Sequence, residues 1–328
     1  MLLTIGIPTY NRSATVVSLL HQLLAEPGAE LVDILVIDDG SSDGTFARLR
    51  DDPTIAARVR VLNNDVNLGY PRTYARAFAE CRTEYLMLMA DDDLVIAENL
   101  AALLDYLERE RPAFVSPQFL KGATVYRGRS TTGPIAPGEF LACSAHAPGL
   151  VYRVEDCRDA LAELASRVES EAADALVYPQ VVVLVNLLIA ARKCEWLALP
   201  TAREEAPLPS GLRDAGGHAY LSVESRWRQL KSFDALLEGR AEQDATGVAR
   251  QLLDAHRARV FVSLARAVRM ENPALGAAFD AGGQKYYRKR SGAPKPPVPE
   301  PAPSPSRLAN LRTAAGRLVR SARALLRR

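Results

Sequence analysis

An apolar strand that runs directly into three consecutive carboxylates is the feature that most constrains this chain. Tyr85–Met89 form the apolar run, and Asp91, Asp92 and Asp93 follow it. Adjacent carboxylates repel one another and resist desolvation, so a cation is expected beside them at the end of a buried strand. The alternative is that the aspartates cap a helix predicted over Ile96–Glu110, because acidic residues favour the positive end of a helix dipole.

Short apolar runs alternate with amphipathic helical patterns before this point, which is typical of parallel strands joined by crossover helices. The predicted strands are Leu3–Ile7, Asp33–Ile37, Val59–Asn63 and Tyr85–Met89, and the predicted helices are Ser13–Ala25, Asp43–Asp51 and Pro71–Cys81. Each strand ends in a polar cluster. Because the carboxyl ends of parallel strands line one crevice, these four clusters are expected to converge on one cleft.

The rest of the chain is predicted to complete an α/β domain and then to become helical. Further strands are expected at Ala113–Pro117 and Gly149–Arg153, and a further helix at Asp156–Val168. The apolar run Val181–Ala191 is compatible with a buried helix or a strand, and its length favours a helix. We place this domain at residues 1–205 and a helical region at residues 206–290. Residues 291–306 form a proline-rich linker, and residues 307–328, with seven arginines and no acid, a basic amphipathic helix.

The composition indicates a globular protein and narrows its class. The chain has 328 residues, is 48% hydrophobic and carries a net charge of +2, which gives no reason to expect nucleic-acid binding. Four separated cysteines without a CxxC spacing indicate reduced thiols of a cytoplasmic protein. The longest apolar stretch, Val181–Ala191, is too short to span a bilayer, and the N-terminal sequence lacks a signal-peptide pattern.

Four motifs, in this order and at this spacing, resemble the inverting family 2 glycosyltransferases: TIGIPTYNR, DILVIDDGSSDGT, NLG and the strand ending ADDD. The resemblance covers Leu3–Leu94 and extends more loosely to Trp196. It implies a GT-A fold, an α/β fold with a mostly parallel Rossmann-like sheet flanked by helices. Residues 1–115 would form its nucleotide-binding half and residues 116–205 its acceptor half.

The same resemblance implies an activity of the bacterial surface-polysaccharide type. A hexosyl or deoxyhexosyl group would pass from a nucleotide-sugar donor to a hydroxyl of a glycan or lipid-linked glycan. A UDP-sugar is the favoured donor, and another pyrimidine nucleotide is the alternative. A nucleotidyl transferase would also use a metal and carboxylates at strand ends, but the chain lacks a glycine-rich phosphate loop of the GxxxxGK kind.

The resemblance places the donor nucleoside at the ends of the first two strands. The residues expected to border it are Pro8, Thr9, Tyr10 and Arg12. Asp39 is expected to accept a hydrogen bond from the pyrimidine N–H, because an ionised carboxylate can only accept hydrogen bonds and a uracil ring offers one imide donor. The alternative is that Asp38–Asp43 form an ordinary turn and helix cap, and both roles can hold together.

The resemblance assigns the metal and the diphosphate to the aspartate triplet. Asp92 is the expected direct ligand, with Asp91 on the ribose side and Asp93 as a second ligand or a support. Mg²⁺ or Mn²⁺ suits oxygen ligands and would neutralise charge on the departing diphosphate. Arg72 and His218 are further candidates for diphosphate contact, although Arg72 can equally be solvated and a lone histidine is often incidental.

The chain departs from the family at the general base, which relatives place in a Glu-Asp pair opening a late helix. Residues Tyr178–Gln180 occupy this place, and an amide cannot act as a base. The nearest carboxylates are Asp174, which we favour, then Glu171 and Glu169, although each is also compatible with a solvated helix surface. The missing pair motivates a second hypothesis, a catalytically silent nucleotide-binding subunit of a membrane-associated polysaccharide assembly.

The basic helix predicted over residues 307–328 suggests where the protein acts. Its leucines and alanines repeat every three or four residues, so they share one face and most arginines take the other. Such a helix is typical of a segment that lies on an anionic membrane surface. We therefore expect peripheral attachment to the inner face of the cell membrane; the alternative is docking onto the protein's own helices or a partner helix.

Overall fold

The structure, a computed structural model, describes residues 1–205 and 222–271. The chain divides into two compact units, one of residues 1–210 and 237–252 and one of residues 211–236 and 253–328. His218 and the predicted segments 291–306 and 307–328 lie outside the described residues. None of the helices in the described ranges is long and apolar enough to cross a membrane.

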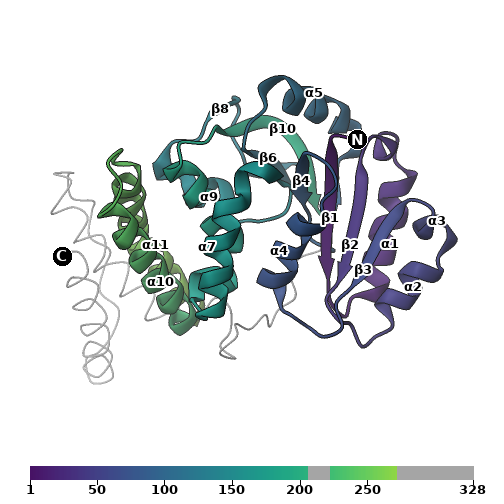
Figure 1. Cartoon of the computed structure of the whole chain (residues 1–328), viewed down its shortest axis with the longest axis horizontal. Coiled ribbons are helices and arrows are strands. Elements are labelled where there is room, and N and C mark those ends of the chain that lie inside the picture. The colour runs from purple at the N-terminus through teal and green to yellow at the C-terminus, as the bar shows by residue number, and fades with distance from the viewer. Residues whose placement is uncertain (206–221, 272–328) are drawn as a thin grey trace, which may run out of the picture. The chain divides into compact units, whose positions relative to one another are not determined.

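The first unit is built on one sheet (Figure 1). Its strands are β1 (Leu3–Thr9), β2 (Asp33–Asp38), β3 (Val59–Asn63), β4 (Tyr85–Leu88), β5 (Asp93–Val95), β6 (Phe114–Lys121), β7 (Thr124–Arg127), β8 (Gly133–Pro134), β9 (Leu150–Arg153) and β10 (Cys194–Glu204). Its helices are α1 (Ser13–Ala25), α2 (Thr45–Asp51), α3 (Pro53–Ala56), α4 (Tyr70–Glu80), α5 (Leu100–Glu110), α6 (Phe140–Ser144), α7 (Arg158–Glu169), α8 (Ala173–Val177) and α9 (Pro179–Ile189).

The strand order is β3-β2-β1-β4-β9-β6-β10-β5, with β7 beside β6 and β8 beside β10. Strands β1 to β4 are parallel, as predicted, and so are β6 and β10. Strand β9 runs antiparallel between β4 and β6, and β5, β7 and β8 are also antiparallel to their neighbours. The sheet is therefore mixed, because most strands of its second half pair antiparallel with strands that are distant in the chain.

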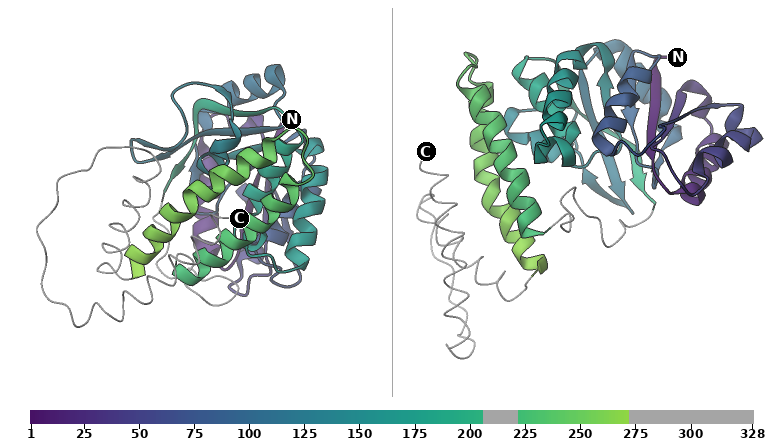
Figure 2. Two further views of the ribbon diagram at one scale, coloured as in Figure 1. Left: turned by 90° about the vertical axis from the view of Figure 1, so that its left-hand side faces the viewer. Right: turned by 60° about the horizontal axis from the view of Figure 1, so that its bottom comes forward.

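Helices flank both faces of the sheet (Figure 2). On one face Leu3, Ile5 and Ile7 of β1 share a buried core with the apolar side of α1. On the other face α4 packs closely, because a Cβ at Gly6 would lie 3.0 Å from Leu86 and 3.6 Å from Ala77. Side chains of β1 thus alternate between the two faces of the sheet. This alternation fixes the register of the strand, since a shift by one residue would bring every core side chain to the wrong face.

The helices and strands predicted from periodicity are confirmed, with small shifts at their ends. The apolar stretch at Val181–Ala191 is helical, within α9. The helix expected from Ile96 begins as a turn of 3₁₀ helix at Ala97–Asn99 and continues as α5. Strand β10 was not predicted, because Pro200 and several small or polar residues interrupt its apolar pattern.

The second unit is described through parts of two long helices, α10 (Val223–Ala241) and α11 (Val248–Glu271), which the sequence predicts. Within this unit Arg257 of α11 forms two hydrogen bonds with the carboxylate of Asp234 of α10, at 2.9 and 3.1 Å. His256 Nε2 lies 3.0 Å from the carbonyl oxygen of Leu230. These polar contacts fix the register of the two helices.

Candidate active site

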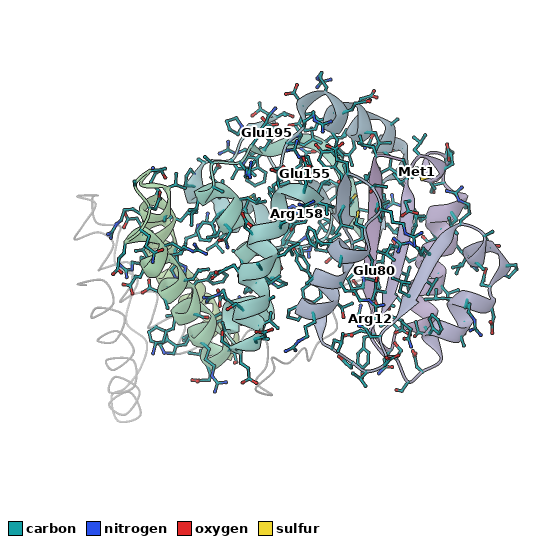
Figure 3. The ribbon with its side chains drawn as sticks, viewed as in Figure 1. Met1, Arg12, Glu80, Glu155, Arg158 and Glu195 are labelled. Atoms are coloured by element: carbon teal, nitrogen blue, oxygen red, sulfur yellow. The ribbon has the colours of Figure 1, made fainter. Side chains whose placement is uncertain are left out.

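The carboxyl ends of β1 and β4 are joined by a network around the aspartate triplet. Thr9 donates a hydrogen bond of 2.7 Å to Asp91, and both side chains are buried. The Arg12 guanidinium donates to Asp91 at 2.8 Å and to Asp92 at 2.6 Å. Arg12 lies at this edge of the sheet, and Met1 lies at the opposite edge (Figure 3).

Backbone pairing brings the ends of neighbouring strands to the same level. Thr9 of β1 is in register with Asp38 of β2, and its carbonyl oxygen accepts a hydrogen bond of 2.8 Å from the amide of Asp39. The carbonyl oxygen of Asp38 in turn accepts a bond of 2.8 Å from the amide of Asn64, after β3. The expected convergence of polar clusters on one edge is therefore present.

The triplet is not a helix cap. Asp93 opens the short strand β5, and the N-cap residue of α5 is Asn99, whose side chain makes no capping bond. A loop and a strand thus separate Asp91 and Asp92 from the helix dipole. The capping alternative is wrong, and another reason is needed for three adjacent carboxylates.

The electrostatics of the triplet are unfavourable without a further cation. Burial raises the pKa of Asp91, against the effect of Arg12. Burial, together with the charges of Asp92 and Glu204, raises the pKa of Asp93 to about 7. Arg12 is shared by Asp91 and Asp92, and the charges of Lys121 and Arg127 do not offset the rise at Asp93, so the negative charge at this edge is only partly compensated.

The oxygen atoms of the triplet suit a hard divalent cation. One carboxylate oxygen of Asp92 and both of Asp93 accept no hydrogen bond from the described residues. Within the described residues no group of three or more acidic, histidine or cysteine side chains is arranged to hold a metal. Mg²⁺ is commonly held by one or two carboxylates together with substrate phosphates, and this donor set fits Asp92 and Asp93.

Asp39 organises the loop that follows β3. Its carboxylate accepts hydrogen bonds from the side chain of Asn64 at 2.6 Å and from the amides of Leu68 and Gly69, both at 2.9 Å. Asp39 is buried, and three of its roughly four acceptor positions are used by the protein. Its predicted bond to a pyrimidine remains a prediction, with one acceptor position on Oδ2 left for it.

The rim of this edge carries exposed apolar side chains. Pro8 is half-buried within β1, whereas Tyr10 beyond it is 44% exposed. Leu68 and Tyr70, beside the Asp39 loop, are also exposed. This second group was not predicted from the sequence, although the NLGY segment contains two large apolar residues at a predicted turn. The predicted phosphate ligand Arg72 is exposed on α4, where it donates weakly to the carbonyl oxygen of Leu68 at 3.5 Å.

The candidate bases lie in the connection between α7 and α9. Because β9 runs antiparallel to β4 and α7 crosses back, this connection returns to the edge that holds the triplet. Asp174 is fully buried and pairs with Arg167 through bonds of 3.0 and 2.7 Å. Glu171 is exposed, and its backbone has a positive φ of 55°, which is uncommon outside glycine. Glu169 is exposed at the end of α7.

Residues 4–136 match the family model described as Glycosyl transferase family 2. This segment is a family 2 glycosyltransferase domain. Over 119 residues the chain is 28% identical to the abequosyltransferase RfbV of Salmonella typhimurium, and the match covers 35% of each chain. Over 108 residues it is 25% identical to an uncharacterized glycosyltransferase of Haemophilus influenzae, of which it covers 35%. The chain therefore spans about a third of the length of these curated relatives.

Solved structures share the fold over more of the chain. TarS of S. aureus, in complex with UDP-GlcNAc, is 14% identical with a TM-score of 0.57, over 82% of this chain and 81% of that one. The mannosyltransferase PcManGT of Pyrobaculum calidifontis, in complex with GDP-Man and Mn²⁺, is 16% identical with a TM-score of 0.53, over 87% and 79%. At this identity the likeness shows the fold alone, which is the GT-A fold.

Gly40 tests how tightly the Asp39 loop is built. Its φ is +70°, and a Cβ there would lie 2.6 Å from the backbone of Val66. Gly44 also has a positive φ, +82°, but nothing lies within 4 Å of its added Cβ. We predict that Gly40→Ala lowers the free energy of unfolding by about 1–3 kcal/mol more than Gly44→Ala, because only the first must displace backbone. Urea unfolding measures both, and equal losses would contradict the close packing of this loop.

Proposed function

We propose that this domain transfers a sugar from a nucleotide-sugar donor to a hydroxyl group, with inversion and with a divalent metal. The observation that carries the proposal is the linked set of Thr9, Arg12 and the triplet at the strand ends of a family 2 domain. A network that only stabilised the fold would not need three adjacent carboxylates, two of which share one arginine.

Sugar nucleotides as donors are supported by what similar proteins bind. TarS is described with UDP-GlcNAc and PcManGT with GDP-Man, whereas RfbV is named for abequose, a deoxysugar. We propose a nucleoside diphosphate sugar, with UDP favoured because Asp39 can accept from the imide N–H of uracil. The exposed ring of Tyr10 would border the base, and Pro8 and Thr9 would shape the floor beneath the nucleoside.

In the proposed mechanism Asp92 and Asp93 hold Mn²⁺ or Mg²⁺, which when bound neutralises charge on the diphosphate leaving group. Asp91, fixed by Thr9 and Arg12, faces the ribose side. Arg12 holds the first two carboxylates at a set separation, so that little reorganisation is needed when the donor binds. Arg72, and His218 outside the described residues, are the cations proposed to approach the diphosphate.

Inversion requires a base that removes the acceptor proton as the hydroxyl attacks the anomeric carbon. We propose that a carboxylate of the connection between α7 and α9 does this. Exposure favours Glu171, whereas Asp174 would first have to leave its bidentate pair with Arg167. Asp174 thereby moves from first to second candidate on grounds of access.

Asp92→Asn is the direct test of the proposed metal and donor site. The change keeps the size of the side chain but removes the charge, so Mn²⁺-dependent affinity for UDP should fall at least tenfold, equivalent to about 1.4 kcal/mol. Isothermal titration with and without Mn²⁺ measures it. Asp105→Asn, on the exposed side of α5, is the matched control and should bind as the parent does.

The outcomes also separate the enzyme from a silent nucleotide-binding subunit. An enzyme loses both nucleotide binding and sugar transfer in Asp92→Asn. A silent subunit binds nucleotide in an Asp92-dependent way but shows neither transfer nor donor hydrolysis with any sugar nucleotide tested. Unchanged Mn²⁺-dependent affinity in Asp92→Asn would refute the metal assignment in both cases.

The two candidate bases make different predictions. Glu171→Gln should lower kcat by about 10²- to 10⁴-fold and leave UDP affinity and unfolding unchanged. Asp174→Asn removes the buried charge from the bidentate pair with Arg167 and should destabilise the fold by about 3–5 kcal/mol. Steady-state kinetics with urea unfolding distinguishes them. Near-parental turnover of Glu171→Gln, together with a folded but inactive Asp174→Asn, would make Asp174 the base.

We also propose that residues 307–328, which lie outside the described residues, attach the protein to an anionic membrane surface. The support is the sequence pattern, which has seven arginines, most of them opposite an apolar stripe. Each basic residue near the membrane surface contributes about 1 kcal/mol. Attachment would confine the enzyme and a lipid-linked acceptor to one surface. The chain of residues 1–328 should co-sediment with anionic vesicles at low salt, and the truncated chain 1–306 should not; equal sedimentation of the two would refute the role.

A further inference from the structure

A row of charged side chains leads away from the triplet across the edge of the sheet. Asp93 of β5 is in register with Glu204 of β10, and the neighbouring Arg203 is in register with Leu120 of β6. Lys121, next along β6, forms an ion pair of 2.6 Å with Glu204. The row therefore runs from Asp93 on β5, at the proposed metal site, through Glu204 on β10 to Lys121 on β6.

An exposed aromatic ring lies at the far end of this row. Tyr126 of β7 is 53% exposed, yet its orientation is fixed by two neighbours. The ammonium of Lys121 lies 4.2 Å from the centre of its ring, and the ring of His146 meets it edge-on at 5.2 Å between centroids. The other large exposed side chain of this strand, Val125, has no such partners among the described residues.

The side chains that support His146 beneath Tyr126, Phe119 and Arg127, are buried. His146 packs against Phe119 with 4.2 Å between ring centroids. Arg127 is buried and donates to the carbonyl oxygens of His146 at 2.6 Å, Pro148 at 2.7 Å and Pro117 at 3.2 Å. This arginine therefore joins the His146 loop to β6 and holds the imidazole in place.

The position of Tyr126 is not explained by the stability of the hairpin. Phe119 and Arg127, which are cross-strand partners in β6 and β7, already provide the buried contacts there. A large ring that remains mostly in water while its orientation is fixed contributes little to the fold. Such a preorganised amphipathic surface is typical of a binding site, because an aromatic ring offers contact area and the adjacent charges offer hydrogen bonds.

We infer that Tyr126, His146 and Lys121 form a platform that binds a pyranose ring of the acceptor. This inference rests on the proposed glycosyl transfer. A pyranose presents C–H groups on its face, which suit the Tyr126 ring, and hydroxyls on its rim, which suit Lys121 and Glu204. Three strand spacings separate β5 from β7, through β10 and β6, which is about 14 Å at the usual spacing. The platform therefore lies beyond a sugar held at the metal site.

The experiment measures binding of a panel of methyl pyranosides, those of glucose, galactose, mannose and rhamnose, by saturation-transfer NMR in the presence of UDP and Mn²⁺. At least one pyranoside should bind. Tyr126→Ala should raise its Kd about threefold to tenfold, because the ring contact is lost, and Tyr126→Phe should retain it. Val125→Ala is the matched exposed control and should leave the Kd unchanged, with thermal unfolding confirming that each variant folds.

Three results would overturn the inference. One is the absence of binding by every pyranoside, and another is an unchanged Kd in Tyr126→Ala. The third is displacement of the pyranoside by a sugar nucleotide but not by UDP, which would mean that the donor's own sugar occupies the platform. Failure of the proposed function itself would appear differently, as loss of Mn²⁺-dependent UDP binding in the parent protein.

Discussion

The concentration of negative charge where β4 ends is the constraint on which the rest of this site depends. Asp91, Asp92 and Asp93 lie within one strand end, and two of them are buried. Arg12 and Thr9 hold the first two carboxylates but do not neutralise the set. Such an arrangement is costly for folding alone, and it becomes favourable when a cation and an anionic diphosphate complete it.

The parallel half of the sheet converts this constraint into a nucleotide site. Because β1, β2 and β4 are in register, the groups that follow them are held at one level by backbone hydrogen bonds. Asp39 then fixes the loop after β3, and Gly40 allows that loop to approach within backbone contact. The site is thus placed by sheet geometry, and the side chains refine it.

The nucleotide half could be predicted from the sequence because its signals are local. Apolar runs of strand length, polar strand ends and consecutive aspartates are all visible within short windows. The acceptor half depends on pairings between distant residues. Strand β10 gains its place from β6 and β5, and the row from Asp93 to Lys121 exists only after these strands align.

Side-chain partners were the least predictable part of the site. Arg12 was expected beside the nucleoside, and the structure pairs it with Asp91 and Asp92. Asp174 was favoured as a base, yet it is buried within α8 and closed in an ion pair with Arg167. Periodicity shows which face a residue takes, but it does not show which charge will lie opposite.

The central claim is that the aspartate triplet, through a metal, holds the diphosphate of a sugar nucleotide. Anomalous diffraction from crystals grown with UDP and Mn²⁺ tests it most directly, because manganese can be located independently of the fitted protein atoms. The account predicts one strong anomalous peak, which marks a manganese ion in contact with a carboxylate oxygen of Asp92 or Asp93 and with the diphosphate. A bound nucleotide whose diphosphate lies away from the triplet, with no manganese at Asp92 or Asp93, would contradict it.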